Sequence, residues 1–159
     1  MAKAAISPEG RDLLALFGKF ALGHKRWVRA NLPSGGGMTT PRAMVLLMLA
    51  NKTEGVSMSE LGELLGMSPR NMTVLADGLE RERLVRRIPH ARDRRITLVE
   101  ITETGREIAR TELGPAHAAT AALFDDLSPQ ERKELRRLLT KLLESLRARG
   151  IEVPTYDQD

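Results

Sequence analysis

The sequence predicts a mostly α-helical protein with a small β-hairpin wing, arranged as a winged helix-turn-helix with N- and C-terminal dimerisation helices. Three observations carry this prediction. Two short amphipathic segments meet at a tight turn near residues 66–68, an arginine-rich hairpin pattern follows directly, and long apolar stripes lie near both ends. A length of 159 residues suits one domain, so we expect a single domain over residues 1–159.

The first two helices are predicted from spacing and from turn residues. Apolar side chains at intervals of three and four predict a helix over about residues 8–30. The stretch LPSGGG at 32–37 ends it. Thr40 followed by Pro41 predicts an N-cap with proline at the first helical position, and this second helix runs to about Ala50.

The helix-turn-helix is predicted from its caps. In SMSE at 57–60, Ser57 caps the next helix and Glu60 reaches back to it, which makes a capping box. Gly66 ends that helix, and Ser68 with Pro69 begins another almost at once. The helix that begins at Pro69 has an apolar stripe that should point inward, which consists of Met72, Leu75, Ala76 and Leu79.

The period of the pattern changes at residue 84. LVRRI and ITLVEIT predict two antiparallel strands joined by a polar loop at 89–95. Thr102 is expected to cap a long helix over 103–124, with a kink at Gly114 and Pro115 because proline cannot donate a backbone hydrogen bond. LSPQE at 127–131 is a second capping box, and leucines at 135, 138, 139, 142, 143 and 146 mark an amphipathic last helix.

A helix-turn-helix followed by a hairpin predicts binding of double-stranded DNA, with the second helix in the major groove. Arginine and asparagine can make bidentate contacts to guanine and adenine, and the helix N-terminus offers backbone N–H groups to a phosphate. A polar helix with a solvated face is the alternative. The residues of this helix expected at the DNA are Ser68, Arg70, Asn71, Thr73, Val74 and Asp77.

Arginine is concentrated in RLVRRIPHARDRR at 83–95, where six of thirteen residues are arginine and the only acid is Asp93. A narrow minor groove attracts inserted arginine, which we expect of Arg94 at the tip. Asp93 is expected to order the loop by a bidentate ion pair with one guanidinium, and a solvated turn with a surface salt bridge is the alternative. The other arginines expected at the DNA are Arg92 and Arg95 in the loop, and Arg86 and Arg87 at phosphates.

Composition disfavours several other functions. The chain has no cysteine, and its three histidines lack a tight ligand spacing, so we expect no metal and no cofactor. GGG lacks the Lys-Ser/Thr of a phosphate loop, and an enzyme is not expected. The longest apolar run, AMVLLMLA at 43–50, is too short to span a membrane, and no signal peptide is evident, which favours the cytoplasm. The net charge of +4 weakly favours an anionic partner.

Three stretches resemble the MarR family of bacterial transcription regulators. SPRNMTVLADGLERERLVRR at 68–87 is similar to its recognition helix and first wing strand, and TPRAMVLLML at 40–49 to its second helix. DRRITLVEITETG at 93–105 resembles its wing signature, in which Asp93 and Arg95 carry the motif. The resemblance covers about residues 8–148. It implies dimerisation helices at 8–32 and 106–149 around a winged helix-turn-helix at 40–105.

The resemblance also implies a homodimer that represses at a pseudo-palindromic operator, often relieved by a small, frequently phenolic ligand. The sequence departs from the family pattern where Val74 and Gly78 replace common arginines, and where Arg83 replaces the usual glycine that ends the recognition helix. A left-handed backbone would cost Arg83 about 1 kcal/mol, so we expect a different helix end there. Operator preference therefore does not transfer from the family.

The long apolar stripes independently favour a dimer, because one winged helix cannot cover both; an intrachain helical hairpin is the alternative. The resemblance places an effector pocket between the arms and the DNA-binding part. Each candidate has an alternative reading as ordinary packing. Met44 and Met48 suit the core, His24 suits a buried histidine with its hydrogen bonds satisfied, and Trp27 suits an interface. The candidate ligand-binding residues are His24, Trp27, Met44, Met48 and His117.

The sequence therefore predicts a dimeric repressor released by a small aromatic effector. The main alternative is a DNA-binding architectural or constitutive regulator with no effector, and a small molecule that shifts operator affinity would exclude it. A helical protein-interaction module is a third reading, which indifference to DNA would identify.

Overall fold

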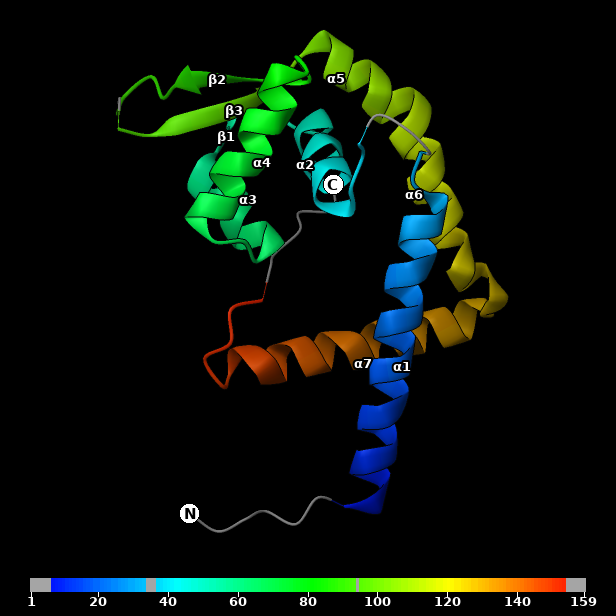
Figure 1. The fold of residues 1–159 in the computed structure, drawn as a ribbon. Helices are drawn as coiled ribbons and strands as arrows, with labels where there is room; N and C mark the ends of the chain where they lie inside the picture. Colours follow the sequence, from blue (N-terminus) through cyan, green and yellow to red (C-terminus); the bar gives the residue numbers. More distant parts are fainter. Residues whose placement is uncertain (1–6, 34–36, 94, 154–159) are drawn as a thin grey trace.

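The computed structural model describes residues 7–33, 37–93 and 95–153. A small antiparallel sheet of order β1-β3-β2 lies among short helices at one end of the molecule (Figure 1). Longer helical segments lead away from this winged part, so the predicted fold class is confirmed. The sheet strands are β1 (Val56–Ser57), β2 (Val85–Pro89) and β3 (Thr97–Ile101).

The first two helices form where the spacing predicts them. Helix α1 spans Pro8–Asn31 and is capped by Ser7, whose hydroxyl accepts a hydrogen bond from the Gly10 N–H at 3.0 Å. Helix α2 spans Thr40–Ala50, but its N-cap is Thr39 and not Thr40, so Pro41 is second in the helix. The prediction was one residue late because two adjacent threonines fit the same signal, and proline is tolerated throughout the first turn.

The helix-turn-helix consists of α3 (Met58–Leu65) and α4 (Pro69–Arg81). The Ser57 hydroxyl accepts from the Glu60 N–H at 3.1 Å, but within the described chain Glu60 makes no return bond, so half of the predicted capping box forms. Ser57 also belongs to β1 and pairs with Leu98 of β3. Gly66 ends α3 in the left-handed conformation, with φ at 60°, as expected of a helix-ending glycine.

The predicted hairpin is present as β2 and β3, with Arg87 opposite Val99 and Ile88 opposite Leu98. Strand β1 was not predicted, because two residues are too few to show an alternating pattern. It pairs Val56 with Val99, which places β3 in the middle of the sheet.

The hydrophobic core lies between the sheet, α2 and α4. Gly105 follows β3 so closely that an added Cβ would overlap the Leu84 carbonyl and lie 2.8 Å from Cγ1 of Ile101. Only glycine fits there, which gives a physical reason for the last residue of the wing signature. The largest fully buried side chains are Val45, Leu46, Leu49, Leu61, Met72, Leu79, Val85, Val99 and Leu113.

The segment predicted as one helix over 103–124 is a succession of helix types. The Thr102 hydroxyl caps α5 (Glu103–Ile108) at the Gly105 N–H. A π-helical segment (Ala109–Leu113) follows, then α6 (Gly114–Ala121) and a 3₁₀ segment (Ala122–Asp126). The Gly114 N–H donates to the Ala109 carbonyl five residues back. Pro115 has no N–H to donate to the Thr111 carbonyl, so the helical hydrogen bonds are interrupted where the sequence predicts. The interruption takes the form of a π-helical segment.

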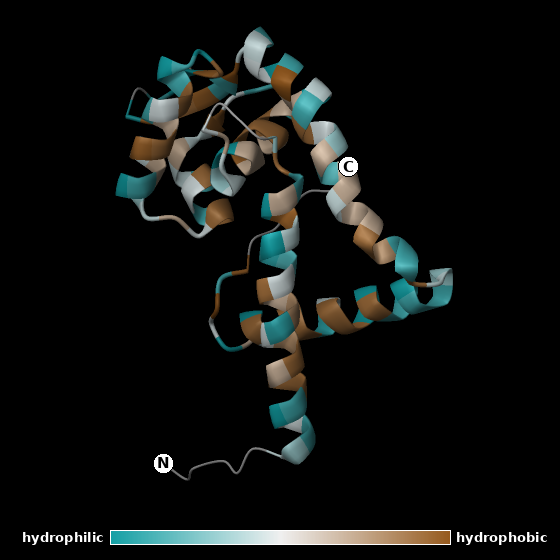
Figure 2. Ribbon diagram, turned by 45° about the vertical axis from the view of Figure 1, so that its right-hand side comes forward, coloured by the Kyte–Doolittle hydropathy of each residue, from teal (hydrophilic) through white to brown (hydrophobic). Residues whose placement is uncertain are grey.

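Helix α7 (Pro129–Arg147) begins with the predicted capping box, in which Ser128 and Glu131 bond each other in both directions. The hydrogen bond from the Ser128 side chain holds the pKa of Glu131 below its usual value. Helices α1, α6 and α7 contain no fully buried residue. Brown apolar positions follow one another along α1 and α7 in Figure 2, and Leu142 of α7 is 58% exposed. Within the described ranges, no helix is both long enough and apolar enough to cross a bilayer.

Candidate nucleic-acid interface

The position of α4 is set by its start and by its buried face. The Ser68 hydroxyl accepts from the Asn71 N–H at 3.3 Å, and Pro69 opens the helix. Met72, Ala76 and Leu79 are buried as predicted, while Leu75 is half-buried. The first turn of α4 is exposed, and of its backbone groups the Arg70 N–H is the one left without a helical or capping partner among the described residues, because Pro69 has no N–H and Ser68 holds that of Asn71.

Four of the predicted DNA-binding residues lie exposed on the outer face of α4: Arg70, Asn71, Thr73 and Val74. The Thr73 hydroxyl donates to the Pro69 carbonyl at 2.9 Å, which leaves its lone pairs and its methyl group on the surface. Val74 is 64% exposed, an unusual degree for a branched apolar side chain. Such a face presents amide, guanidinium and methyl groups together, and these are the groups that read base edges in a major groove.

Asp77, the fifth outward residue, does not stand free. Its carboxylate pairs with the Arg87 guanidinium at 2.5 Å, and the same Arg87 nitrogen lies 3.1 Å from Glu80. Arg87 also donates to the Thr73 carbonyl at 3.3 Å and is only 25% exposed. Its guanidinium is therefore committed to α4 and joins this helix to strand β2. The phosphate contact expected of Arg87 stays a prediction, and the structure gives this side chain an internal partner that the sequence analysis missed.

A second ion pair holds the far end of α4. Arg42 of α2 bonds Glu82 just beyond the helix, and its side chain is 14% exposed. Its buried Nε atom has no partner within the described chain. A Cβ at Gly78 would lie 3.5 Å from the Arg42 guanidinium, an ordinary contact distance, so the Arg42 side chain packs beside Gly78. Arg42 also escaped the sequence analysis, because its partner lies forty residues away.

Helix α4 ends in the conformation that the sequence analysis did not expect. Arg83 has φ at 59°, and the Leu84 N–H donates to the Leu79 carbonyl at 2.9 Å. The Arg83 N–H donates to the Glu80 carbonyl at 2.9 Å. These two bonds form the Schellman motif that normally ends on glycine. The prediction of a different helix end is therefore wrong, because the hydrogen bonds of this motif outweigh a penalty of about 1 kcal/mol.

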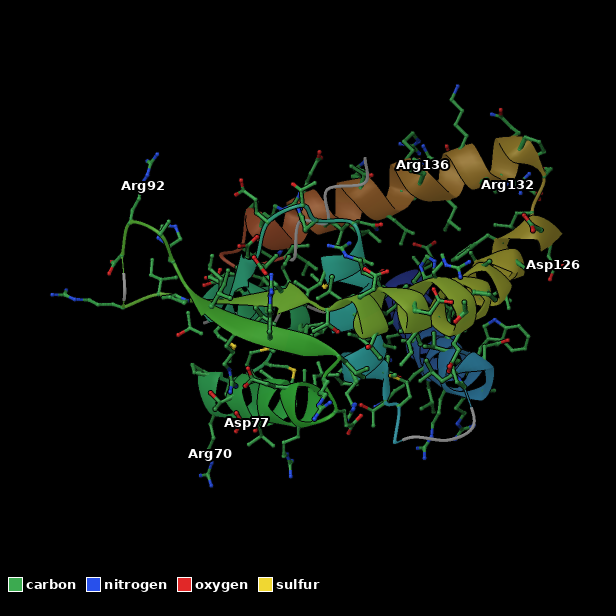
Figure 3. The ribbon with its side chains drawn as sticks, turned by 90° about the horizontal axis from the view of Figure 1, so that it is seen from above. Arg70, Asp77, Arg92, Asp126, Arg132 and Arg136 are labelled. Carbon is green, nitrogen blue, oxygen red and sulfur yellow. The ribbon has the colours of Figure 1, made fainter. Side chains whose placement is uncertain are left out.

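The wing carries its basic residues on the surface. Arg86 is largely exposed and pairs with Glu100, directly opposite on β3, through contacts of 2.6 and 2.8 Å. Arg92 and Arg95 are exposed, and Arg94, the predicted tip residue, lies outside the described residues. Figure 3 shows Arg92 at the wing tip and Arg70 and Asp77 on α4, away from Arg132 and Arg136 on α7.

Asp93 orders the wing in a different way from the one predicted. One carboxylate oxygen accepts a hydrogen bond from the Arg95 backbone N–H at 2.9 Å. Neither Arg92 nor Arg95 pairs with this carboxylate in the structure. The expected guanidinium pair is therefore absent among the described arginines, because a short aspartate reaches the backbone two residues on more readily than a long side chain.

Three of the five candidate ligand residues line one open cleft of about 1050 Å³ between α2, α3, α6 and the segment after α7. Met44 and Met48 are half-buried rather than in the core, and His117 is exposed. His24 and Trp27 are not at this cleft. His24 stacks on Phe20 of the same helix with ring centroids 5.8 Å apart, and Trp27 is 42% exposed. Other residues at the cleft include Leu47, Lys52, Leu64, Arg147 and Ile151.

The described residues contain no cluster of three or more histidines and acids that could hold a metal ion.

Sequence comparison gives a family for the chain. The model of the MarR family matches residues 36–96. The transcriptional repressor MprA of Escherichia coli is 33% identical over 111 residues, which are 69% of this chain and 63% of MprA. The match thus spans less than two thirds of that relative.

Two further relatives match over more of their length. The HTH-type transcriptional regulator YfiV of Bacillus subtilis is 30% identical, with 89% of this chain and 87% of YfiV covered. The transcriptional activatory protein BadR of Rhodopseudomonas palustris is 31% identical, with 78% of this chain and 71% of BadR covered.

Solved structures of low identity share the fold. AbsC, a MarR family regulator from Streptomyces coelicolor, gives a TM-score of 0.81 at 23% identity over 92% of this chain and 99% of that one. Sco3205 from the same organism, solved in complex with DNA, gives 0.79 at 22% identity over 89% and 94%. BpsR of Bordetella bronchiseptica, whose DNA binding is regulated by 6-hydroxynicotinic acid, gives 0.67 at 21% identity over 80% and 90%.

Proposed function

Because this chain belongs to the MarR family of transcription regulators, we propose that it binds operator DNA as a homodimer and regulates transcription in the cytoplasm. The family consists of regulators and not of enzymes, as the sequence analysis expected. One observation carries the proposal. The exposed reading face of α4 and the arginine-rich wing lie toward the same end of the molecule, while the apolar stripes lie on other helices (Figures 2 and 3).

In the proposed complex, α4 enters the major groove. Arg70 and Asn71 can each make two hydrogen bonds to one base, and the exposed methyl groups of Val74 suit the methyl of thymine. The Arg70 N–H at the start of α4 suits a phosphate, because the helix dipole is positive there, whereas Pro69 has no N–H and the Asn71 N–H is bonded to Ser68. Asp77 would repel DNA if it were free, and its pair with Arg87 neutralises it. These features support readout of sequence by α4.

The wing supplies the second contact. Arg92 and Arg95 are exposed near its tip and suit phosphates or a narrow minor groove, and Arg94 stays a prediction at the same place. The exposed stripes of α1 and α7 supply the dimer. Burial of such leucines stabilises association by about 25 cal/mol per Å² of apolar area removed from water, before the entropic cost of association. Two copies related by a two-fold axis would place their α4 helices about 34–36 Å apart.

The experiment is selection of genomic fragments by the purified protein, followed by mass measurement of the free and DNA-bound species. We expect fragments with an inverted repeat and two chains for each site. Arg70→Ala should lower affinity for the selected fragment by about 1–3 kcal/mol. Arg136→Ala is the matched control, since it removes an equally exposed arginine from α7 and should leave affinity unchanged (Figure 3). A monomer that shows no preference among fragments contradicts the proposal.

We further propose that a small organic effector controls this binding from the cleft beside α2. Its apolar part consists of Met44, Met48 and Leu47. Its charged residues are of both signs, Lys52 and Arg147 with Glu60, Glu63 and Glu152, so a small aromatic ligand with a polar group, such as a phenol, suits it. The regulation of BpsR by 6-hydroxynicotinic acid, a hydroxylated aromatic ring, supports this class of ligand. A panel of small phenols and aromatic carboxylates, with the matching saturated ring compounds as controls, should shift affinity for the selected fragment. No shift with any of them would favour a constitutive regulator.

The direction of control needs its own measurement, because a named repressor and a named activatory protein are both among the relatives. We favour repression, as the sequence analysis did. A reporter placed behind the selected fragment should give higher expression when this protein is deleted. Lower expression on deletion would identify an activator.

A further inference from the structure

The turn of the wing is built around the side chain of His90. Its Nδ1 atom accepts hydrogen bonds from two backbone N–H groups, that of Arg92 at 3.3 Å and that of Asp93 at 3.1 Å. Backbone bonds of 3.0 Å close the turn, from the His90 N–H to the Ile96 carbonyl and from the Ile96 N–H to the Asp93 carbonyl. Together with the Asp93 carboxylate at the Arg95 N–H, two side chains satisfy three N–H groups of the turn.

This use of histidine sets a condition on its protonation. A neutral imidazole has one donor and one acceptor nitrogen, and an imidazolium has two donors and no acceptor. The contacts at Nδ1 therefore require the neutral form of His90 with its proton on Nε2. Aspartate and asparagine usually provide such bonds to the backbone ahead of them, and neither loses its acceptor near neutral pH. Histidine does, since it commonly titrates between pH 5 and 8.

We propose that His90 is a positioning residue of the wing. In its neutral form it holds the backbone that presents Arg92 and Arg95, and protonation releases that backbone and lowers the preference for operator over other DNA. This inference rests on the proposed DNA-binding function. It assigns to the wing a sensitivity to pH that the exposed arginines themselves cannot have, because guanidinium stays charged throughout this range.

The wing that carries His90 also carries charged residues. In the described part of the turn these are Arg92, Asp93 and Arg95, and on β2 the nearest along the chain is Arg87, whose guanidinium is turned toward α4. On β3 the charged residue is Glu100, which pairs with Arg86.

On DNA the phosphates favour the imidazolium, so protonation has two opposite effects on binding. The added charge raises affinity for every duplex. The loss of the ordered turn acts only where the wing must fit a defined groove. The informative quantity is therefore the ratio of affinities for the selected genomic fragment and for a random duplex of equal length, measured at one salt concentration.

The first measurement uses the full-length protein without DNA. Proton–nitrogen correlation through the imidazole ring reports which nitrogen carries the proton, and His90→Asn identifies the signal among the three histidines. We expect an unprotonated Nδ1 at about pH 8, and lower protection of the Arg92 and Asp93 amides, relative to the intrinsic exchange rate at each pH, when the pH is lowered to about 5.5. A proton on Nδ1 at high pH, or amide protection that is the same at both pH values, would overturn the inference.

The second measurement uses DNA and two variants of opposite design. Asparagine places an acceptor near the position of Nδ1 and does not titrate, whereas glutamine places it near Nε2. For the wild type, the affinity ratio should fall about fivefold to tenfold from about pH 8 to 5.5, as expected for loss of the turn's hydrogen bonds. His90→Asn should keep the high ratio at every pH, and His90→Gln should show a low ratio at every pH.

The outcomes separate this inference from the proposed function. If no fragment is enriched, the proposed DNA binding fails, and the ring measurement alone still decides what His90 does to the turn. If a fragment is enriched but His90→Asn shows the same pH dependence as the wild type, the inference about His90 fails while DNA binding stands. If His90→Gln kept the wild-type ratio of affinities, the inference about His90 would likewise fail while DNA binding stands.

Discussion

Replacement of Arg83 by glycine should stabilise the folded protein, because Arg83 holds a backbone conformation that favours glycine. Its φ of 59° is the only positive value at a non-glycine residue in the described chain. The bonds of the Schellman motif on either side of it fix that conformation, and the Thr102 hydroxyl donates to the Arg83 carbonyl at 2.6 Å. If Arg83 moved to another region of backbone dihedral angles, these hydrogen bonds would break. The folded protein therefore keeps the energetic cost of a left-handed Arg83.

The magnitude follows from two opposing terms. The left-handed conformation costs a non-glycine residue about 1–2 kcal/mol. Glycine avoids that cost but has more freedom to lose from the unfolded chain, which leaves a net gain of about 0.5–1 kcal/mol. For a protein of this length, 1 kcal/mol shifts Tm by about 2–4 °C, so Arg83→Gly should raise Tm by about 1–4 °C.

Two variants isolate the backbone effect. Arg83→Ala removes the guanidinium but keeps the Cβ, and it should change stability by less than about 0.5 kcal/mol. Gly66 ends α3 with nearly the same φ, 60°, and no atom lies within 4 Å of the place a Cβ would take. Gly66→Ala should therefore destabilise by about 0.5–1 kcal/mol, because the backbone strain exceeds the gain from a less flexible unfolded chain.

Equilibrium urea unfolding at one fixed protein concentration is the suitable assay, because association makes the midpoint depend on concentration. The midpoint should move while the slope stays constant. If Arg83→Gly is no more stable than Arg83→Ala, the left-handed residue carries no penalty and this reasoning is refuted.

Three further predictions follow from contacts in the winged part. Gly105→Ala should destabilise by more than about 3 kcal/mol, seen as a large loss in the same urea assay, because its Cβ would overlap the Leu84 carbonyl; a normal midpoint would contradict this. Arg87→Met should cost about 1 kcal/mol of stability and weaken DNA binding by freeing Asp77, and Asp77→Asn in that background should restore binding, as a double-mutant cycle will measure; no recovery would contradict the role given to this pair. Asp93→Asn should keep the turn and hold or raise affinity for the selected fragment, whereas Asp93→Ala should lower it about fivefold to tenfold in salt titrations; equal effects of both would show that the acceptor is unimportant.

The parts of the fold that the sequence predicts well are those set by neighbouring residues. Ser68, Gly66 and the alternation around Val99 act within a few positions, so the helix-turn-helix and the hairpin were predictable. Strand β1 was not, since it exists only through its pairing with β3. The choice between Thr39 and Thr40 as N-cap likewise depends on how the chain enters α2.

In the candidate nucleic-acid interface too, features set by neighbouring residues were predictable and features set by distant contacts were not. Exposure of Arg70 and Asn71 follows from the apolar stripe of α4, and it was predicted. The partners of Arg87 depend on how β2 meets α4, which no local pattern contains, whereas the Asp93 bond to the Arg95 N–H is local and was open to prediction from the aspartate alone. In the cleft proposed for an effector, Met44 and Met48 were identified from the second helix. Lys52 and Arg147 escaped because they lie far apart in the sequence, just after α2 and at the end of α7, and only the fold brings them to one cleft.

The π-helical segment from Ala109 to Leu113 also sets a rotational register along the connection to α7. An α-helix turns by about 100° for each residue, so the extra residue that the π turn contains rotates everything after it by about that angle. Its length and that of α6 together fix the direction in which α7 leaves the winged part. Deletion of one residue here would leave the exposed side chains of α4 unchanged. The winged part that carries them would nevertheless be rotated relative to α7. In a two-fold assembly that turn would be applied twice, and the phase between the two reading faces along the DNA would change with it.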